Sequence, residues 1–247
     1  MKKGVYVNAA LGCFLAAGLA VPLTQAVAQE DDPTYIQVRT MNVKPDKVVE
    51  YLELQAQFAE AQKAIGESRG FYQEVRGNSQ TFYAVRTLDS FADNDAEFDS
   101  GMSDEDWGRW ISAFQDTLDS STFQILRSHP EYSLPAEDGS QPNMIYLRFR
   151  TVASGMMGAY HDWVANKLVP ALREGGAKGI TFSHSSIGGP TNTWVSASRI
   201  ENWAELDGEG PLAYMGQEAV ADLLGEAAAM QTGGENRLLR FRADLSY

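Results

Sequence analysis

The amino-acid sequence predicts an α+β fold in which a unit of strand, helix, strand, strand, helix and strand occurs twice in tandem. Three segments recur in the same order: residues 35–40 return as 146–151, 86–93 as 199–205, and 125–133 as 238–246. Their offsets are 111, 112 to 113, and 113 residues. A nearly constant offset of this size indicates a duplicated small domain, because solenoid repeats are much shorter. The second observation is the hydrophobic periodicity, which assigns each element in turn.

The first residues are typical of a secretory signal peptide. Lys2 and Lys3 precede a mostly apolar stretch over residues 5–23, and Ala-Val-Ala at 26–28 forms a cleavage site. We therefore expect residues 1–28 to be removed and the mature chain to be periplasmic or secreted. An uncleaved membrane anchor and lipidation at Cys13 are the alternatives, and a cleaved chain has no integral membrane segment.

The acidic composition limits the classes of partner. The chain has 33 acidic and 20 basic residues, and loss of residues 1–28 removes Lys2 and Lys3, which leaves a net charge of −15. A surface of this sign argues against binding to nucleic acid, which needs clustered cations. Cleavage also removes Cys13, so the mature chain has neither a thiol nor a disulfide.

The first unit is predicted over residues 29–134. A strand over 35–41 is followed by a helix that begins near Pro45, which suits a first helical turn. Residues 71–76 and 81–87 form a hairpin, and a second helix begins at Ser103, which resembles a capping box with Asp106. A strand over 122–127 ends the unit. The apolar stripes of the two helices are Tyr51, Leu54, Phe58, Ala61 and Ile65, and Trp107, Trp110, Ile111, Phe114 and Leu118.

The second unit is predicted over residues 143–247, after a polar, proline-containing linker at 135–142. The same order of elements recurs in it. We expect a strand over 144–152, a helix over 156–172 interrupted near Pro170, a hairpin of 180–185 with 193–199, a helix over 211–230, and a strand over 237–242.

This order is the split βαβ arrangement of ferredoxin-like domains. The motif Val-Lys-Pro-Asp-Lys at 43–47 and the acidic-small-aromatic segments at 88–93 and 200–205 resemble the dimeric α/β-barrel superfamily, in its antibiotic-biosynthesis-monooxygenase-like or NIPSNAP-like branch. The resemblance implies two ferredoxin-like βαββαβ units that pair their antiparallel sheets into one intrachain α/β barrel. Monooxygenases, haem enzymes and lactone isomerases share this superfamily, so the fold implies no single chemistry.

Strand alternation predicts a set of arginines inside that barrel. If apolar residues such as Ile36 and Val38 face the helices, their polar neighbours face the interior. A buried guanidinium must pair with an internal carboxylate, such as Glu74, or with an anionic ligand. Both explanations stay open. The predicted ligand-binding residues are Arg39, Tyr146, Arg148, Arg150, Arg240 and Arg242, with His184, whose direction the sequence leaves open.

The remaining reactive side chains predict no cofactor and no metal site. His129 precedes Pro130, which favours a solvated turn, and His161 fits a partly buried structural position on a helix. Haem ligation by His161 or His184 stays open, although the helix that often supplies the ligand in haem-degrading members contains no histidine. No histidine and carboxylate spacing matches a metal motif.

The sequence therefore favours an exported, soluble α/β-barrel protein that binds a small anionic organic molecule. A cofactor-independent monooxygenase or isomerase is the first alternative, and a non-catalytic interaction module is the second. A polar cavity would favour binding or catalysis, whereas a filled interior with an exposed apolar patch would favour the interaction module. The sequence does not decide the oligomeric state.

Overall fold

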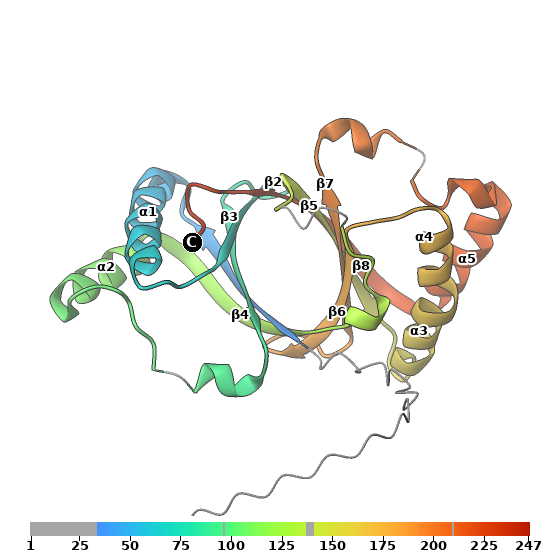
Figure 1. Cartoon of the computed structure of the whole chain (residues 1–247), viewed down its shortest axis with the longest axis horizontal. Coiled ribbons are helices and arrows are strands. Elements are labelled where there is room, and N and C mark those ends of the chain that lie inside the picture. Colours follow the sequence, from blue (N-terminus) through green and yellow to red (C-terminus); the bar gives the residue numbers. More distant parts are fainter. Residues whose placement is uncertain (1–33, 96, 137–140, 209) are drawn as a thin grey trace, which may run out of the picture. The chain divides into compact units, whose positions relative to one another are not determined.

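A computed structural model describes residues 34–247 except 96, 137–140 and 209, and in it eight strands form a closed antiparallel barrel (Figure 1). The predicted fold class is confirmed. The predicted signal peptide and residues 137–140 of the predicted linker lie outside the described residues. No helix in the described part of the chain has the length and hydrophobicity needed to cross a membrane.

The two halves of the described chain have the same order of elements. The first half contains β1 (Tyr35–Val43), α1 (Val48–Ala64), β2 (Gly70–Arg76), β3 (Thr81–Leu88), α2 (Asp104–Asp116) and β4 (Leu118–Ser128). The second contains β5 (Met144–Val152), α3 (Met157–Trp163), α4 (Val169–Glu174), β6 (Ile180–Ile187), β7 (Thr193–Ile200), α5 (Gln217–Ala229) and β8 (Gln231–Phe241).

Two junctions close the barrel. The strand order is β1-β3-β2-β8-β5-β7-β6-β4, so each half contributes a four-stranded sheet. At one junction β2 pairs with β8, with Glu74 opposite Leu239, and at the other β4 pairs with β6, with Leu126 opposite Ser185. Because both edge strands of each sheet pair with the other half, closure leaves no free sheet edge in the barrel.

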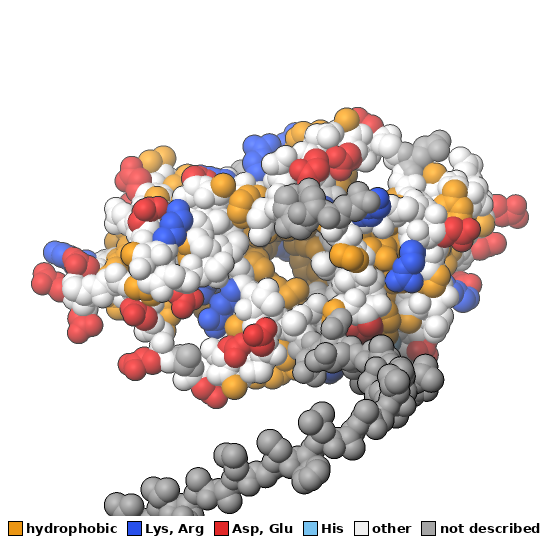
Figure 2. Space-filling model, in the orientation of Figure 1, with side chains coloured by type: hydrophobic (Ala, Val, Ile, Leu, Met, Phe, Trp, Pro, Cys, Tyr) orange, Lys and Arg blue, Asp and Glu red, His pale blue; other side chains and the backbone are white. Residues whose placement is uncertain are grey.

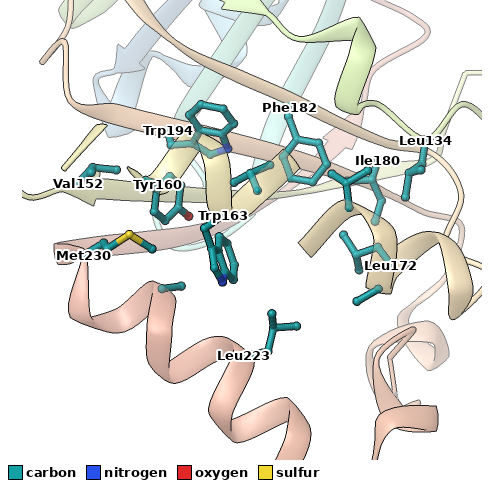
Figure 3. Close-up of a cluster of buried hydrophobic side chains, with 14 residues drawn as sticks. Leu134, Val152, Tyr160, Trp163, Leu172, Ile180, Phe182, Trp194, Leu223 and Met230 are labelled. Carbon is teal, nitrogen blue, oxygen red and sulfur yellow. The ribbon is translucent and has the colours of Figure 1, made fainter. Parts of the chain in front are cut away.

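The helices pack on the outer face of the sheets in two separate cores. In the first half, Phe58, Trp110 and Phe114 of α1 and α2 cover Met41 and Val43 of β1. In the second half, Trp194 of β7 and Phe182 of β6 face Tyr160 and Trp163 of α3 (Figure 3). The helices of each half therefore form their own hydrophobic core with the outer side of the barrel wall.

Local sequence explains where the helices begin and break. The Ser103 hydroxyl accepts a hydrogen bond of 3.2 Å from the Asp106 amide at the start of α2, as the capping pattern predicts. Between α3 and α4, residues Val164–Leu168 form a π-helical turn. Pro170 follows this turn and lacks the amide that a continuous α-helix would use, so the predicted interruption near Pro170 is confirmed.

The predicted boundaries were wrong in three places. Residues 211–216 do not belong to α5, because Gly216 has φ of +77° and a helix cannot pass through that conformation. Strands β4 and β8 begin at Leu118 and Gln231, earlier than predicted. Their first halves are exposed and lack hydrophobic alternation, and backbone pairing with β1 and β5 extends them.

Candidate functional site

The barrel encloses a cavity of about 1050 Å³ (Figure 2). The side chains that line it from β1 and β5 belong to the apolar alternation, including Ile36, Val38, Ile145 and Leu147. The predicted orientation of the side chains in β1 and β5 was therefore wrong. Ile36, Val38, Ile145 and Leu147 face the interior, and the arginines face the outer side of the barrel wall.

The reason lies further along each strand. Met41 and Val43 have the same parity as Arg39, and both are buried in the core formed with α1 and α2. In β5, Val152 has the same parity as Arg148 and belongs to the core beneath α3. The helices cover only one end of the outer face, so that face is polar at one end of the strand and apolar at the other.

Arg39, Tyr146 and Arg148 are held by contacts on the outer face. The Arg39 guanidinium lies 5.0 Å from the Phe114 ring and 4.9 Å from the Phe123 ring. The Arg148 guanidinium stacks 4.4 Å from the Tyr146 ring. Burial lowers the pKa of Arg39 and of Arg148, and these aromatic contacts offset part of the desolvation.

The other predicted site residues are spread along the barrel wall. Arg150 donates hydrogen bonds to the Phe149 carbonyl and to Asn236. Arg242 binds Asp244 through two nitrogens, and Arg240 is exposed. None of these arginines lines the cavity, so the structure does not bring the seven residues into one interior site. Ligand binding by any one of them stays a prediction.

Charged and phenolic groups meet on one part of the cavity wall. The Tyr83 hydroxyl donates a hydrogen bond of 3.0 Å to Oε2 of Glu74 and accepts one from Arg237. Glu74 is 6% exposed, and its Oε1 accepts a hydrogen bond of 3.1 Å from the Asn78 amide. Arg237 also donates to Glu235, at 2.7 Å. Glu74, Tyr83 and Arg237 are called the polar corner below.

Burial determines the protonation of this corner. Desolvation raises the pKa of Tyr83 well above its usual value, so the phenol stays protonated and can donate to Glu74. The corner joins the two halves, because Glu74 and Tyr83 come from β2 and β3 whereas Arg237 comes from β8. At the other junction, an uncharged hydrogen bond of 2.9 Å from Gln124 to Ser185 is found. The cavity thus has charged groups at one junction and amide and hydroxyl groups at the other.

More of the cavity surface is apolar than polar, and its polar part includes threonines, one serine and several side-chain amides. Such a cavity can hold a small organic molecule of mainly apolar surface and can donate or accept a few hydrogen bonds. The apolar lining residues are Ile36, Val38, Val85, Leu126, Ile145, Leu147, Phe149, Val195, Ala197 and Leu239.

The sequence prediction included Glu74 only as a partner for arginine, and it missed Tyr72, Tyr83 and Arg237 as cavity residues. One signal was available. Tyr72 and Glu74 alternate on β2, and Tyr83 shares their side of the β2–β3 hairpin because it pairs with Tyr72. Arg237 gave no such signal. It has the same parity as the apolar Leu239, and apolar strand residues were expected to face the helices, whereas both residues line the cavity.

A second cluster of functional side chains lies outside the barrel wall. All three histidines of the sequence meet there. His129 Nε2 lies 2.7 Å from His184 Nδ1, and His129 Nδ1 lies 2.9 Å from Oε1 of Glu131. The His161 ring centre is 5.2 Å from that of His129. The predicted solvated turn at His129 was wrong, since this side chain is 6% exposed.

Backbone pairing builds this cluster. After β4, the His129 amide donates to the Phe182 carbonyl at 2.8 Å, and Leu134 forms a bridge with Ile180. The segment from His129 to Leu134 therefore runs alongside β6. His184 and Trp194 are paired residues of β6 and β7, and both rings lie on the helix-covered face, where the Trp194 ring stacks on His129 with centroids 4.9 Å apart.

Desolvation keeps two of these imidazoles neutral. Burial, together with the neighbouring His129 and Arg127, lowers the pKa of His184 to about 4. Burial also lowers the pKa of His129, although Glu131 opposes this shift. Neutral imidazoles offer one lone pair each, which is the form that binds metals.

The cluster does not fit a haem. An axial histidine needs an open, flat space beside its coordinating nitrogen. Both nitrogens of His161 lie 3.3 Å from the Tyr132 hydroxyl, and the His184 ring stacks on Trp194 while it contacts His129. Of the described residues that line the barrel cavity, none is a histidine. Haem ligation by His161 or His184 is therefore not supported by the arrangement of the described residues.

Comparisons with known proteins show the fold alone. No protein-family model matches the sequence, and no curated protein matches it. Among solved structures, an anthrone oxidase-like protein is 13% identical, with a TM-score of 0.58, and the match covers 86% of this chain and 92% of that one. A "putative monooxygenase" from Fusobacterium nucleatum is 10% identical, with a TM-score of 0.58 and coverage of 85% and 92%.

A third solved structure, a "putative monooxygenase" from Lactobacillus acidophilus, is 10% identical and has a TM-score of 0.55. The match covers 85% of this chain and 94% of the other. The ferredoxin-like barrel that the sequence resemblance implied is therefore confirmed, while the identities are too low to transfer an activity.

Proposed function

We propose that this protein binds a small, uncharged and largely apolar organic molecule inside its barrel. The observation that carries the proposal is the cavity of about 1050 Å³ with its mainly apolar wall and one polar corner. Ligand sites typically combine an apolar cavity of this order with a few polar groups that orient the ligand. An open interior also favours binding over a purely structural interaction module.

The charges of the polar corner favour a neutral ligand. Arg237 is already bound to Tyr83 and Glu235 and lies 3.9 Å from Glu74. Two carboxylates thus surround one guanidinium, and an anionic ligand would meet net negative charge. The sequence-based expectation of an anionic ligand depended on a predicted set of interior arginines, none of which lines the cavity. A hydroxyl group on a neutral ligand can instead donate to the remaining lone pair of the Tyr83 oxygen.

Two related fluorescent probes test this proposal. N-phenyl-1-naphthylamine is neutral, whereas 1-anilinonaphthalene-8-sulfonate has a similar ring system and a negative charge. We expect saturable binding of the neutral probe, with one site per chain, and weaker binding of the sulfonate. Equal or tighter binding of the sulfonate would contradict the preference for an uncharged ligand.

A cavity-filling substitution tests the location of the probe, with a surface substitution as the matched control. Leu147→Trp places a larger side chain in the cavity and should weaken binding of the neutral probe about tenfold or more, because the added ring takes up space that the probe would occupy; tenfold corresponds to about 1.4 kcal/mol. Val49→Trp adds the same ring at a helix residue that is 71% exposed. That control should bind the probe normally. Equal affinities in both variants would place the probe outside the barrel.

Catalysis is a second candidate function, supported by the contact between Glu74 and Tyr83. The Glu74 carboxylate can take a proton from a carbon acid, and the Tyr83 hydroxyl, released from the neutralised Glu74, can then donate to the resulting oxyanion. The arrangement suits a cofactor-independent monooxygenase or isomerase. Glu74→Gln would abolish turnover while probe binding persists, whereas a binding protein would show no turnover in either form.

We also propose export to the periplasm or the exterior, on the basis of the charged start, the apolar stretch and the Ala-Val-Ala site at 26–28. N-terminal sequencing of the protein from its source should find Gln29 at or near the first position. Detection of Met1, or of lipid on Cys13, would contradict this expectation.

A further inference from the structure

We propose that His129, Glu131 and His161 form a binding site for a divalent transition-metal ion such as Zn²⁺. Each of the three side chains offers one ligand atom, and these atoms lie within 4.8 Å of one another. The site lies outside the barrel wall and does not depend on the ligand proposed for the cavity.

The ligand set matches the chemistry of such ions. Two imidazoles and one carboxylate are a common set for zinc, with bonds of about 2.0–2.2 Å and at least one further position for water. Ligand atoms on one tetrahedral ion lie about 3.3 Å apart. His129 Nδ1 and Glu131 Oε1 are already at 2.9 Å. The Glu131 side chain is 52% exposed and can adjust to an ion, while buried His129 fixes the position of the site.

The neighbouring histidine completes the arrangement. When the Nδ1 lone pair of His129 binds the ion, its Nε2–H can donate to His184 Nδ1, which lies 2.7 Å away. Metal-bound histidines usually donate their second N–H in this way, because the contact fixes the tautomer and the ring orientation. Without the ion, the same contacts are satisfied when His184 donates to His129 and His129 donates to Glu131. At these two contacts, binding therefore needs only a change of tautomer in both rings, and the three ligand atoms need a small shift to close around the ion.

The surroundings hold these rings in place. Trp194 stacks on His129 and meets the edge of His161, with centroids 4.9 Å and 5.7 Å apart. The Tyr132 hydroxyl lies 3.3 Å from the His161 nitrogens, where it can bind the ion or its water. The Glu131 carboxylate reaches solvent, which gives an ion access to the site.

Calorimetric titration of the full chain with Zn²⁺ tests the proposal, after treatment with a chelator and dialysis. We expect one ion per chain. Glu131→Gln and His161→Gln should each weaken binding by about 100-fold or more, since loss of a mere outer partner already costs about 10- to 100-fold. His184→Phe keeps an aromatic ring on Trp194 but loses the acceptor, and should weaken binding by about 10- to 100-fold.

Glu226→Gln is the matched control, because the Glu226 side chain is 48% exposed and pairs with Lys167 elsewhere in the same half. It should bind Zn²⁺ as the unchanged protein does. Because Glu131 is exposed, Glu131→Gln should fold normally, and thermal melting can confirm this. The proposal therefore stays testable even if a histidine variant fails to fold. Absence of binding, or equal affinity in the unchanged protein and Glu131→Gln, would overturn the proposal. The spectrum of bound Co²⁺ should show tetrahedral or five-coordinate nitrogen and oxygen ligation, and an octahedral aqueous spectrum would contradict it.

Discussion

The Tyr83 hydroxyl donates a hydrogen bond of 3.0 Å to the Glu74 carboxylate inside the closed barrel. The same hydroxyl accepts a hydrogen bond from Arg237, so a single phenol connects a buried carboxylate of one half with a guanidinium of the other. This contact gives the cavity its polar corner and contributes to the β2–β8 junction.

Loss of the Tyr83 hydroxyl should destabilise the protein. Tyr83→Phe removes the group that connects Glu74 with Arg237, and a lost hydrogen bond to a charged group costs about 1.5–3 kcal/mol. Urea denaturation should show this decrease in the free energy of unfolding. Tyr214→Phe is the control, because Tyr214 is 48% exposed and water can replace its hydrogen bonds to the Ala171 carbonyl and to the exposed Glu174. If both substitutions lowered the free energy of unfolding equally, the Tyr83 hydroxyl would contribute no more to stability than an exposed hydroxyl.

Gly77→Ala should disturb the polar corner through Glu74. A Cβ at Gly77 would lie 1.8 Å from Oε1 of Glu74, and the backbone there has φ of +113°. Backbone strain alone costs about 1–3 kcal/mol, and the clash adds to it. In Gly66→Ala, φ is +81° and nothing lies within 4 Å of the new Cβ, so only strain applies. Thermal melting should therefore show a larger loss for Gly77→Ala, and similar losses would argue against the close approach.

Arg148→Met should change stability without affecting the cavity. Arg148 donates a hydrogen bond of 2.9 Å to Ser198 and stacks on Tyr146 on the outer face. Its loss should lower the free energy of unfolding by about 1 kcal/mol, with the affinity for N-phenyl-1-naphthylamine unchanged. Arg237→Met should cost about 3 kcal/mol, because Glu74 then loses its nearby cation. A loss of probe affinity in Arg148→Met would return Arg148 to the binding site.

The separated halves should associate. Residues 34–134 and 143–247 each contain a four-stranded sheet whose edge strands pair with the other half in the whole chain. Alone, each half exposes these edges and the apolar wall of the cavity. Light scattering should detect dimers or larger species for each half. Two stable, folded monomers would show that closure of the barrel contributes little to either sheet.

Local signals made the order of elements predictable. The alternation of β1, the capping serine of α2 and the proline behind the π-helical turn all act within a few residues, so they are visible in the sequence. The extended starts of β4 and β8 were not visible, because pairing with distant strands holds them there. The prediction of which β1 side chains face the helices was wrong for a related reason. Ile36 and Val38 face the cavity, whereas the equally apolar Met41 and Val43 face the helices, so alternation alone did not decide between the two faces.

The sequence by itself determined the α+β class and the strand and helix order, because periodicity and turn residues act locally. The closed pairing of two similar sheets was implied only by the family resemblance, and the structure confirms it. Only the tertiary structure decided which face of each strand meets the cavity, because both faces of this barrel wall are partly apolar. It also decided that His129, His161 and His184 meet. Their contacts depend on how β4, α3 and β6 pack, and chain positions so far apart carry no spacing from which that packing can be predicted.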